Sequence, residues 1–171
     1  MKKYEFTGET KEIRLLFRTA TLHRIRATVA FGIVEVGDLG GWIEKEENLS
    51  HEGKAWVCGD AEVWGNAKVW GNAKVCGDAE VCGDAEVFSA SHVLVIGAIG
   101  SRNDFTTFYR DKDNEITVKC GCFLGKIDRF LEKVTQTHGD SKYALVYRAA
   151  VEVAKLQIDL SGEAPKDADE E

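Results

Sequence analysis

The sequence predicts a mainly β protein: a short parallel β-helix with an N-terminal β cap and a C-terminal α+β unit made of a hairpin and two helices. Two observations predict this fold. Six consecutive six-residue repeats, each beginning with glycine, occupy 53–88, and a degenerate seventh follows at 89–94. Two alternating apolar segments and two helical apolar patterns come next. The predicted parts are a cap at 1–36, a repeat body at 37–97, an α+β unit at 98–160 and a disordered acidic tail at 161–171.

The chain before the repeats is expected to close one end of the repeat body. Apolar residues alternate with polar ones between 13 and 36, which is typical of β-strands. A stack of repeats needs such a cap because its last unit would otherwise expose its core. Residues 37–49, with Trp42 and Leu49 among their apolar anchors, are expected to form an irregular first turn of the body.

The repeats predict a triangular prism. In Ala61-Glu62-Val63 and its equivalents, alanine and valine alternate with a charged residue, so the two small side chains face inward. The glycine of each hexad supplies the turn that ends the strand. If three hexads close one turn of the chain, residues eighteen apart stack at about 4.8 Å. Val63 is then expected over Val81, and Cys58 over Cys76.

Large aromatic side chains do not fit inside so narrow a prism. We therefore expect Trp64, Trp70 and Phe88 to point outward at its corners. A row of exposed aromatic rings is unusual on a monomer, so this strip predicts cover by another subunit or by the C-terminal segment. We assign these three residues to an interface between copies of the chain, and predict a homo-oligomer.

The α+β unit is predicted from a change in periodicity. Residues 105–109 and 116–123 alternate as two strands of a hairpin around a polar turn. Apolar residues then recur at helical spacing up to Val134, with Gly139 as the stop, and a second helix is expected to begin near Ser141.

Several motifs resemble known proteins. The repeats GDAEVW, GNAKVW and GDAEVC resemble the hexapeptide-repeat family, whose members fold as left-handed parallel β-helices. The segment 37–57, GDLGGWIEKEENLSHEGKAWV, is similar to the start of bacterial and phage proteins of this kind that are labelled as transferases. GSRND, CGCF and THGD resemble motifs in the C-terminal segment of the phage-type members. The resemblance implies a left-handed β-helix and a gene of phage or prophage origin.

Charge and composition exclude several classes. The net charge of −7 disfavours direct nucleic-acid binding, which needs a basic surface. It leaves open an acidic protein that imitates nucleic acid. The sequence lacks an export signal and an apolar run of about 18 residues, which predicts a cytoplasmic protein without a membrane span. Five cysteines in such a protein are expected to be reduced.

The candidate ligand-binding residues are Arg102, Asn103, Asp104, Thr106, Thr107 and His138. Most of them form a polar cluster at the junction between repeats and α+β unit, where pockets often form. Arg102 offers a two-pronged donor for phosphate or carboxylate. The structural alternative is that Arg102 pairs with Asp104 in a turn, and that His138 satisfies the end of a helix.

Two other groups suggest chemistry less strongly. His51 and His92 flank the repeats, and a histidine serves as general base in hexapeptide-repeat acyltransferases. Cys120 and Cys122 would need two further ligands to hold a metal, so buried structural thiols are the favoured interpretation. No metal and no cofactor are predicted.

The sequence favours a nonenzymatic binding or interaction protein. In this hypothesis an oligomeric rod presents its C-terminal module to a small polar or anionic ligand or to a host protein. The phage-type resemblance implies an inhibitor of host defence or a ligand sequestrant. The alternative is a hexapeptide-repeat acyltransferase with His92 or His51 as its base.

Overall fold

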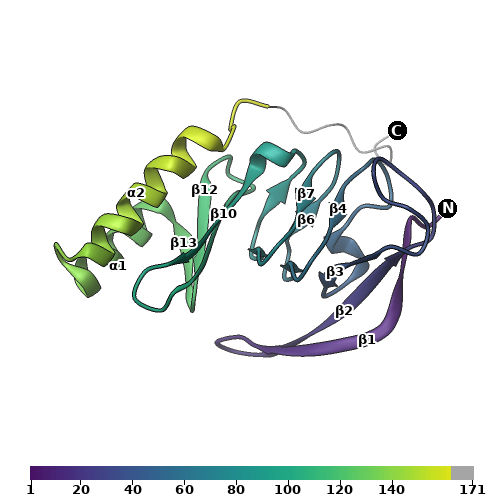
Figure 1. Ribbon diagram of the computed structural model, residues 1–171, viewed down its shortest axis with the longest axis horizontal. Helices are drawn as coiled ribbons and strands as arrows, with labels where there is room; N and C mark the ends of the chain where they lie inside the picture. The colour runs from purple at the N-terminus through teal and green to yellow at the C-terminus, as the bar shows by residue number, and fades with distance from the viewer. Residues whose placement is uncertain (163–171) are drawn as a thin grey trace.

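The structure, a computed structural model, describes residues 1–162. This part of the chain is mainly β, with a five-stranded sheet, a four-stranded sheet, two two-stranded sheets and two α-helices. Figure 1 shows the C-terminal sheet and its helices at one end of the long axis, the repeat region (residues 53–88) beside them, and the N-terminal hairpin running beneath the repeat region. Among the described residues, no helix is long and apolar enough to cross a membrane.

The N-terminal hairpin consists of β1 (Tyr4–Arg14) and β2 (Thr19–Ala27), which pair in antiparallel register. On β2, alternate residues such as Ala20 and Leu22 are buried, as expected for a strand with one face on the core. Strand β3 (Leu39–Ile43) continues this sheet beside β2. The strands predicted within 13–36 are therefore present in part, but the hairpin begins earlier, at Tyr4.

The repeat region contains two-residue strands that pair in parallel with partners eighteen residues away. These strands are β4 (Trp56–Val57), β5 (Glu62–Val63), β6 (Lys68–Val69), β7 (Lys74–Val75), β8 (Glu80–Val81) and β9 (Glu86–Val87). Val63 pairs with Val81 and Glu62 with Glu80, so the predicted register is confirmed. Each hexad glycine has a positive φ, between 61° and 70°, which glycine adopts without strain.

The interior of the repeat region is made of alanine and valine. Every one of these inward residues is at most 1% exposed: Ala55, Val57, Ala61, Val63, Ala67, Val69, Ala73, Val75, Ala79, Val81, Ala85 and Val87. Small side chains fill the space because strands only two residues long bring the surrounding backbone close together.

The predicted fold class, a left-handed parallel β-helix with added ends, is wrong. Residues 1–162 contain no continuous parallel β-helix: their strands belong to separate small sheets, and most of the pairing is antiparallel. Only two residues of each hexad form a strand. Because there are only six hexads, each set of parallel strands contains just two or three short strands. The longer strands lie before and after the repeats, where they form antiparallel ladders.

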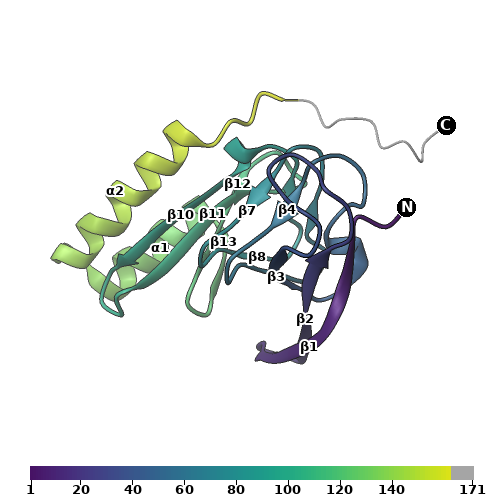
Figure 2. The same cartoon turned by 45° about the vertical axis from the view of Figure 1, so that its right-hand side comes forward.

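The C-terminal unit is an antiparallel sheet with two helices on one face. Its strands are β10 (Val93–Ile99), β11 (Asp104–Arg110), β12 (Ile116–Cys120) and β13 (Phe123–Lys126), in that order across the sheet. Helices α1 (Ile127–His138) and α2 (Lys142–Gln157) lie on the side of the sheet away from the repeats (Figures 1 and 2). The strand predicted at 105–109 and both predicted helices are confirmed, including the end of α1 at Gly139. The strand predicted at 116–123 is too long, because the chain turns at Gly121 and Cys122 and continues as β13.

Strand β11 attaches this unit to the repeats. Tyr109 is fully buried within the alanine and valine core, and its hydroxyl donates a hydrogen bond to the Cys82 carbonyl at 2.9 Å. The Thr107 hydroxyl accepts a hydrogen bond from the backbone N–H of Glu80 at 3.0 Å. These contacts close the open end of the repeat core.

The corner aromatics are covered largely by the chain itself. Trp64 packs with Leu22 of the N-terminal hairpin and is 5% exposed. Phe88, 8% exposed, contacts Trp70 and lies 4.6 Å below the Arg110 guanidinium. The N-terminal hairpin therefore covers Trp64, and Arg110 of the C-terminal unit covers Phe88, while Trp70 is half-buried.

The eighteen-residue register also decides the state of two cysteines. Cys58 and Cys76 directly follow the neighbouring strands β4 and β7, with 4.5 Å between their Cα atoms, and they form a disulfide. The expectation of reduced thiols is wrong for this pair, whereas Cys82, Cys120 and Cys122 are free. The predicted disordered tail at 161–171 falls almost wholly outside the described residues.

Candidate functional site

Several of the predicted ligand-binding residues line one pocket of about 220 Å³ in the C-terminal unit. We call it the junction pocket. It lies among the β10–β11 turn, the β12–β13 turn and helices α1 and α2. Its lining includes Arg102, Asp104, Cys120, Cys122, Lys133, His138 and Tyr147.

The β10–β11 turn brings Arg102 to the pocket. Gly100 has φ +77° and Asn103 has φ +47°, and the Asn103 N–H donates to the Gly100 carbonyl at 3.3 Å. A Cβ atom at Gly100 would come 1.9 Å from the Tyr147 hydroxyl oxygen. Glycine is therefore required there, both for the backbone conformation and for the approach of α2.

The β12–β13 turn forms the facing side. Cys120 pairs with Phe123, and Gly121 and Cys122 make a two-residue hairpin loop in which Gly121 has φ +56°. A Cβ atom at Gly121 would lie 3.4 Å from Arg102 Nη1, so the guanidinium sits directly against this loop.

The helices supply an aromatic floor. The Tyr147 ring packs edge-on against Phe130, with 5.6 Å between centroids, and stacks on His138 at 5.7 Å. Burial raises the pKa of Tyr147 above its ordinary value, and the Cys120 thiol beside its hydroxyl adds to the shift. The hydroxyl consequently stays protonated and can donate to a ligand.

Two side chains that carry a positive charge, Arg102 and Lys133, line the pocket together with the His138 imidazole. Within residues 1–162 none of the three forms an ion pair with an acidic side chain. Asp104 also lines the pocket, but its Oδ1 accepts the N–H of Phe105 at 2.7 Å. The Arg102–Asp104 ion pair of the structural alternative is thus absent from the described contacts.

The remaining predicted residues have other positions. Thr107 binds the repeat region, and the buried Thr106 hydroxyl donates to Cys120 Sγ at 3.4 Å, behind the pocket. Asn103 forms the turn and does not line the cavity. The sequence analysis did not identify Lys133 and Tyr147 as pocket residues. Lys133 lines the pocket together with Thr137, and their spacing of four residues, which places both on one face of α1, is visible in the sequence.

Cys120 and Cys122 both line the pocket. In the part of the chain that the structure describes, no group of three or more histidine, cysteine, aspartate or glutamate side chains is arranged to hold a metal ion. The third partner that both thiols would need for a metal site is therefore missing among these residues.

The two candidate general bases are occupied by backbone contacts. His92 is 2% exposed, and its Nδ1 accepts the N–H of Phe88 at 3.2 Å. His51 Nδ1 accepts the N–H of Lys3 at 3.1 Å, and its ring stacks on Tyr4. Burial lowers the pKa of both imidazoles, which keeps them neutral at neutral pH.

No protein-family model matches this sequence, and no curated protein is significantly similar to it. The resemblance to hexapeptide-repeat proteins is thus neither supported nor refuted by these comparisons. What the chain does must be argued from the geometry of its own sites.

Proposed function

We propose that the protein is a nonenzymatic binding protein that holds a small anionic ligand in the junction pocket. One observation carries the proposal: Arg102, Lys133 and His138 converge from a turn and a helix without an acidic side chain paired to any of them in residues 1–162. The volume of about 220 Å³ is below the roughly 300–1,000 Å³ of a typical site for a drug-sized ligand, so the pocket suits a smaller, compact anion.

The chemistry of the lining describes the ligand. The Arg102 guanidinium can donate two parallel hydrogen bonds to a phosphate or carboxylate, and Lys133 adds a point charge. Phe130 and Tyr147 offer an apolar surface beside these donors. An anion with a compact or flat body satisfies both parts of the pocket, because it can pair with Arg102 and Lys133 and cover the rings.

Sequestration without turnover is the favoured form of this binding. The acyltransferase alternative relies on His92 or His51 as base, but each accepts a backbone N–H through Nδ1, and neither lines a cavity that we describe. The phage-type resemblance makes bacterial antiviral defence the setting to test, and the cytoplasm its expected location. The Cys58–Cys76 disulfide is unusual for that compartment.

The test is calorimetric titration with inorganic phosphate, pyrophosphate and citrate. We expect at least one of these anions to bind, and Arg102→Ala or Lys133→Ala to weaken it about tenfold or more, as for the loss of a charge-assisted hydrogen bond. Arg129→Ala is the matched control, because Arg129 is an exposed α1 residue outside the junction pocket.

Two results would contradict the proposal. The first is the absence of binding by all three anions. The second is an equal effect of the Arg102 and Arg129 substitutions. Melting curves of each variant separate loss of binding from loss of fold, and an Arg102→Ala protein that unfolds would mark the turn as structural, leaving Lys133→Ala to decide.

Self-association remains part of the proposal, through the outer face of α2. Leu145, Ala149, Val153 and Leu156 form an apolar stripe opposite the buried face, and Leu156 is 89% exposed. The four residues of this stripe are separated by four, four and three positions, so the stripe has nearly the same spacing from either end of α2. An antiparallel two-fold pairing would therefore place Leu145 opposite Leu156 of a second copy. Leu156→Lys should lower the mass measured by sedimentation from that of a dimer to that of a monomer. If the unsubstituted protein already sediments as a monomer, this part of the proposal is refuted.

A further inference from the structure

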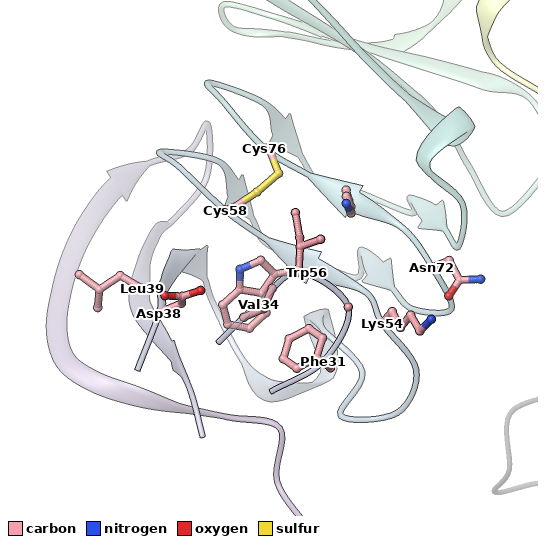
Figure 3. A pocket seen from close by; sticks show the side chains of 12 residues that line it. Phe31, Val34, Asp38, Leu39, Lys54, Trp56, Cys58, Asn72 and Cys76 are labelled. Atoms are coloured by element: carbon pink, nitrogen blue, oxygen red, sulfur yellow. A yellow bond between two sulfur atoms is a disulfide. The ribbon is translucent and has the colours of Figure 1, made fainter. Parts of the chain in front are cut away.

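A second cavity, of about 510 Å³, lies on the opposite part of the molecule, between the loop that joins β2 to β3 and the β4–β7 pair. Phe31, Val34 and Trp56 gather at its centre, and the Cys58–Cys76 disulfide closes one side (Figure 3). Its volume falls within the range of about 300–1,000 Å³ typical of small-molecule sites.

The wall of this cavity is a fixed loop. Phe31 and Val34 exchange two backbone hydrogen bonds, of 3.0 and 2.9 Å, around the turn at Gly32 and Ile33. The Phe31 ring packs edge-on against Trp56, with 5.3 Å between centroids. The cavity is therefore preformed, which lowers the entropic cost of binding.

The cavity rim is unusually apolar for a surface. Ile33 at the turn is 82% exposed, and Leu39 at the start of β3 is 55% exposed. Both side chains line the cavity beside the buried Trp56. A ligand with an apolar body would remove this surface from water, at roughly 25 cal/mol per Å².

The charges around the cavity are asymmetric. Lys54 and Asn72 lie on the side opposite Leu39 and Asp38 (Figure 3). Lys74 also lines the cavity, on the strand beside Trp56. Neither lysine forms an ion pair within residues 1–162.

Asp38 is already engaged, since its Oδ2 accepts the N–H of Glu35 at 2.8 Å. A carboxylate placed beside Asp38 would be repelled, whereas one placed beside the two lysines would be attracted. The apolar and cationic sides thus set the orientation that an amphipathic anion would take.

We propose that this cavity binds an amphipathic carboxylate, with its apolar body along Trp56 and Leu39 and its carboxylate at Lys54 and Lys74. The site is independent of the junction pocket, because no residue is shared between the two. A neutral amphiphile lacks the attraction to the lysines, and a cationic one is repelled by them.

The test uses the full chain and three probes built on a ten-carbon chain: sodium decanoate, decanol and decyltrimethylammonium. The two ionic probes are used below their micelle concentrations, and decanol below its solubility limit. Binding is followed by calorimetry and by tryptophan fluorescence, since Trp56 lies in the cavity floor. We expect decanoate to bind about tenfold or more tightly than the cationic probe.

Two substitutions test the assigned contacts. Lys74→Glu should weaken decanoate binding about tenfold, because it replaces attraction by repulsion. Lys68→Glu is the matched control: Lys68 occupies the same position of the preceding GNAKV hexad, is equally exposed, and lies outside the cavity. Leu39→Ser should weaken decanoate and decanol alike, since it removes apolar contact only.

The proposal is overturned if decanoate fails to bind, if it binds no better than decyltrimethylammonium, or if Lys74→Glu and Lys68→Glu have the same effect. Sedimentation analysis covers the remaining alternative. A dimer that Leu39→Ser dissociates, together with no decanoate binding, would show that a second copy of the chain occupies this face instead.

Discussion

Removing one hydroxyl group from Tyr109 tests whether β11 closes the repeat core. The Tyr109 ring is fully buried, and burial holds its pKa well above the ordinary value, so the hydroxyl keeps its proton and donates to the Cys82 carbonyl at 2.9 Å. Tyr109→Phe deletes that bond and leaves the Cys82 carbonyl with only the longer hydrogen bond from the Ala85 N–H, at 3.3 Å.

The size of the effect follows from these contacts. A hydrogen bond contributes about 0.5–1.5 kcal/mol net, and the Cys82 carbonyl keeps its bond from the Ala85 N–H, so we expect Tyr109→Phe to destabilise the protein by about 1 kcal/mol. For a chain of this length, that corresponds to a fall of roughly 2–4 °C in melting temperature. Tyr109→Ala adds a cavity and should cost about 3–5 kcal/mol.

Urea unfolding followed by circular dichroism measures these values. Tyr143→Phe is the control, because Tyr143 is 39% exposed and its hydroxyl has no described hydrogen bond. A Tyr109→Phe protein within about 0.5 kcal/mol of its parent would refute the reasoning, since the hydroxyl would then contribute nothing to closing the core.

Three further predictions concern pH, the disulfide and the core. Burial lowers the pKa of His92 in the folded protein below its unfolded value, so the neutral imidazole contributes its full stability above about pH 6.5 and less as the pH falls. The urea midpoints measured near pH 7.5 and pH 5.5 should therefore differ less for His92→Gln than for the parent. Reduction of the Cys58–Cys76 disulfide opens an eighteen-residue loop and should lower the free energy of unfolding by about 3 kcal/mol. The same reductant should not change the stability of Cys58→Ser. If it destabilises the parent and Cys58→Ser equally, the disulfide does not contribute as inferred. Val69→Asp should abolish folding by circular dichroism, while Lys68→Asp folds, and a folded Val69→Asp protein would contradict the inward register.

Local patterns predicted the C-terminal unit well. The spacing of apolar residues up to Val134 and the glycine at 139 are signals carried within a few turns of one helix, so α1 and its end follow from them. Alternation likewise predicted β11 and the start of β12, but not the turn at Gly121 and Cys122. The start of β1 at Tyr4 was not, because that strand is mostly exposed and its sequence lacks a regular apolar face.

The candidate site was predictable only in part. Arg102 and His138 were identified because they are polar residues that belong to no predicted apolar face, and this can be seen in the sequence. Lys133 and Tyr147 were missed, since Lys133 resembles any exposed helix residue and Tyr147 any buried one. Their role depends on the contact between α2 and the β10–β11 turn, where Gly100 admits the Tyr147 hydroxyl.

The sequence by itself determined the eighteen-residue register, the inward alanine and valine set and the stacking of Cys58 over Cys76, because a fixed repeat imposes the same local conformation on every hexad. Only the tertiary structure decided what surrounds that core. The antiparallel sheets at both ends, the burial of Trp64 beneath Leu22 and the insertion of Tyr109 depend on contacts between residues far apart in the chain. Such contacts leave no periodic signal in the sequence, because each of them is formed only once. The separation of the two residues along the chain also does not tell how far apart they lie in space.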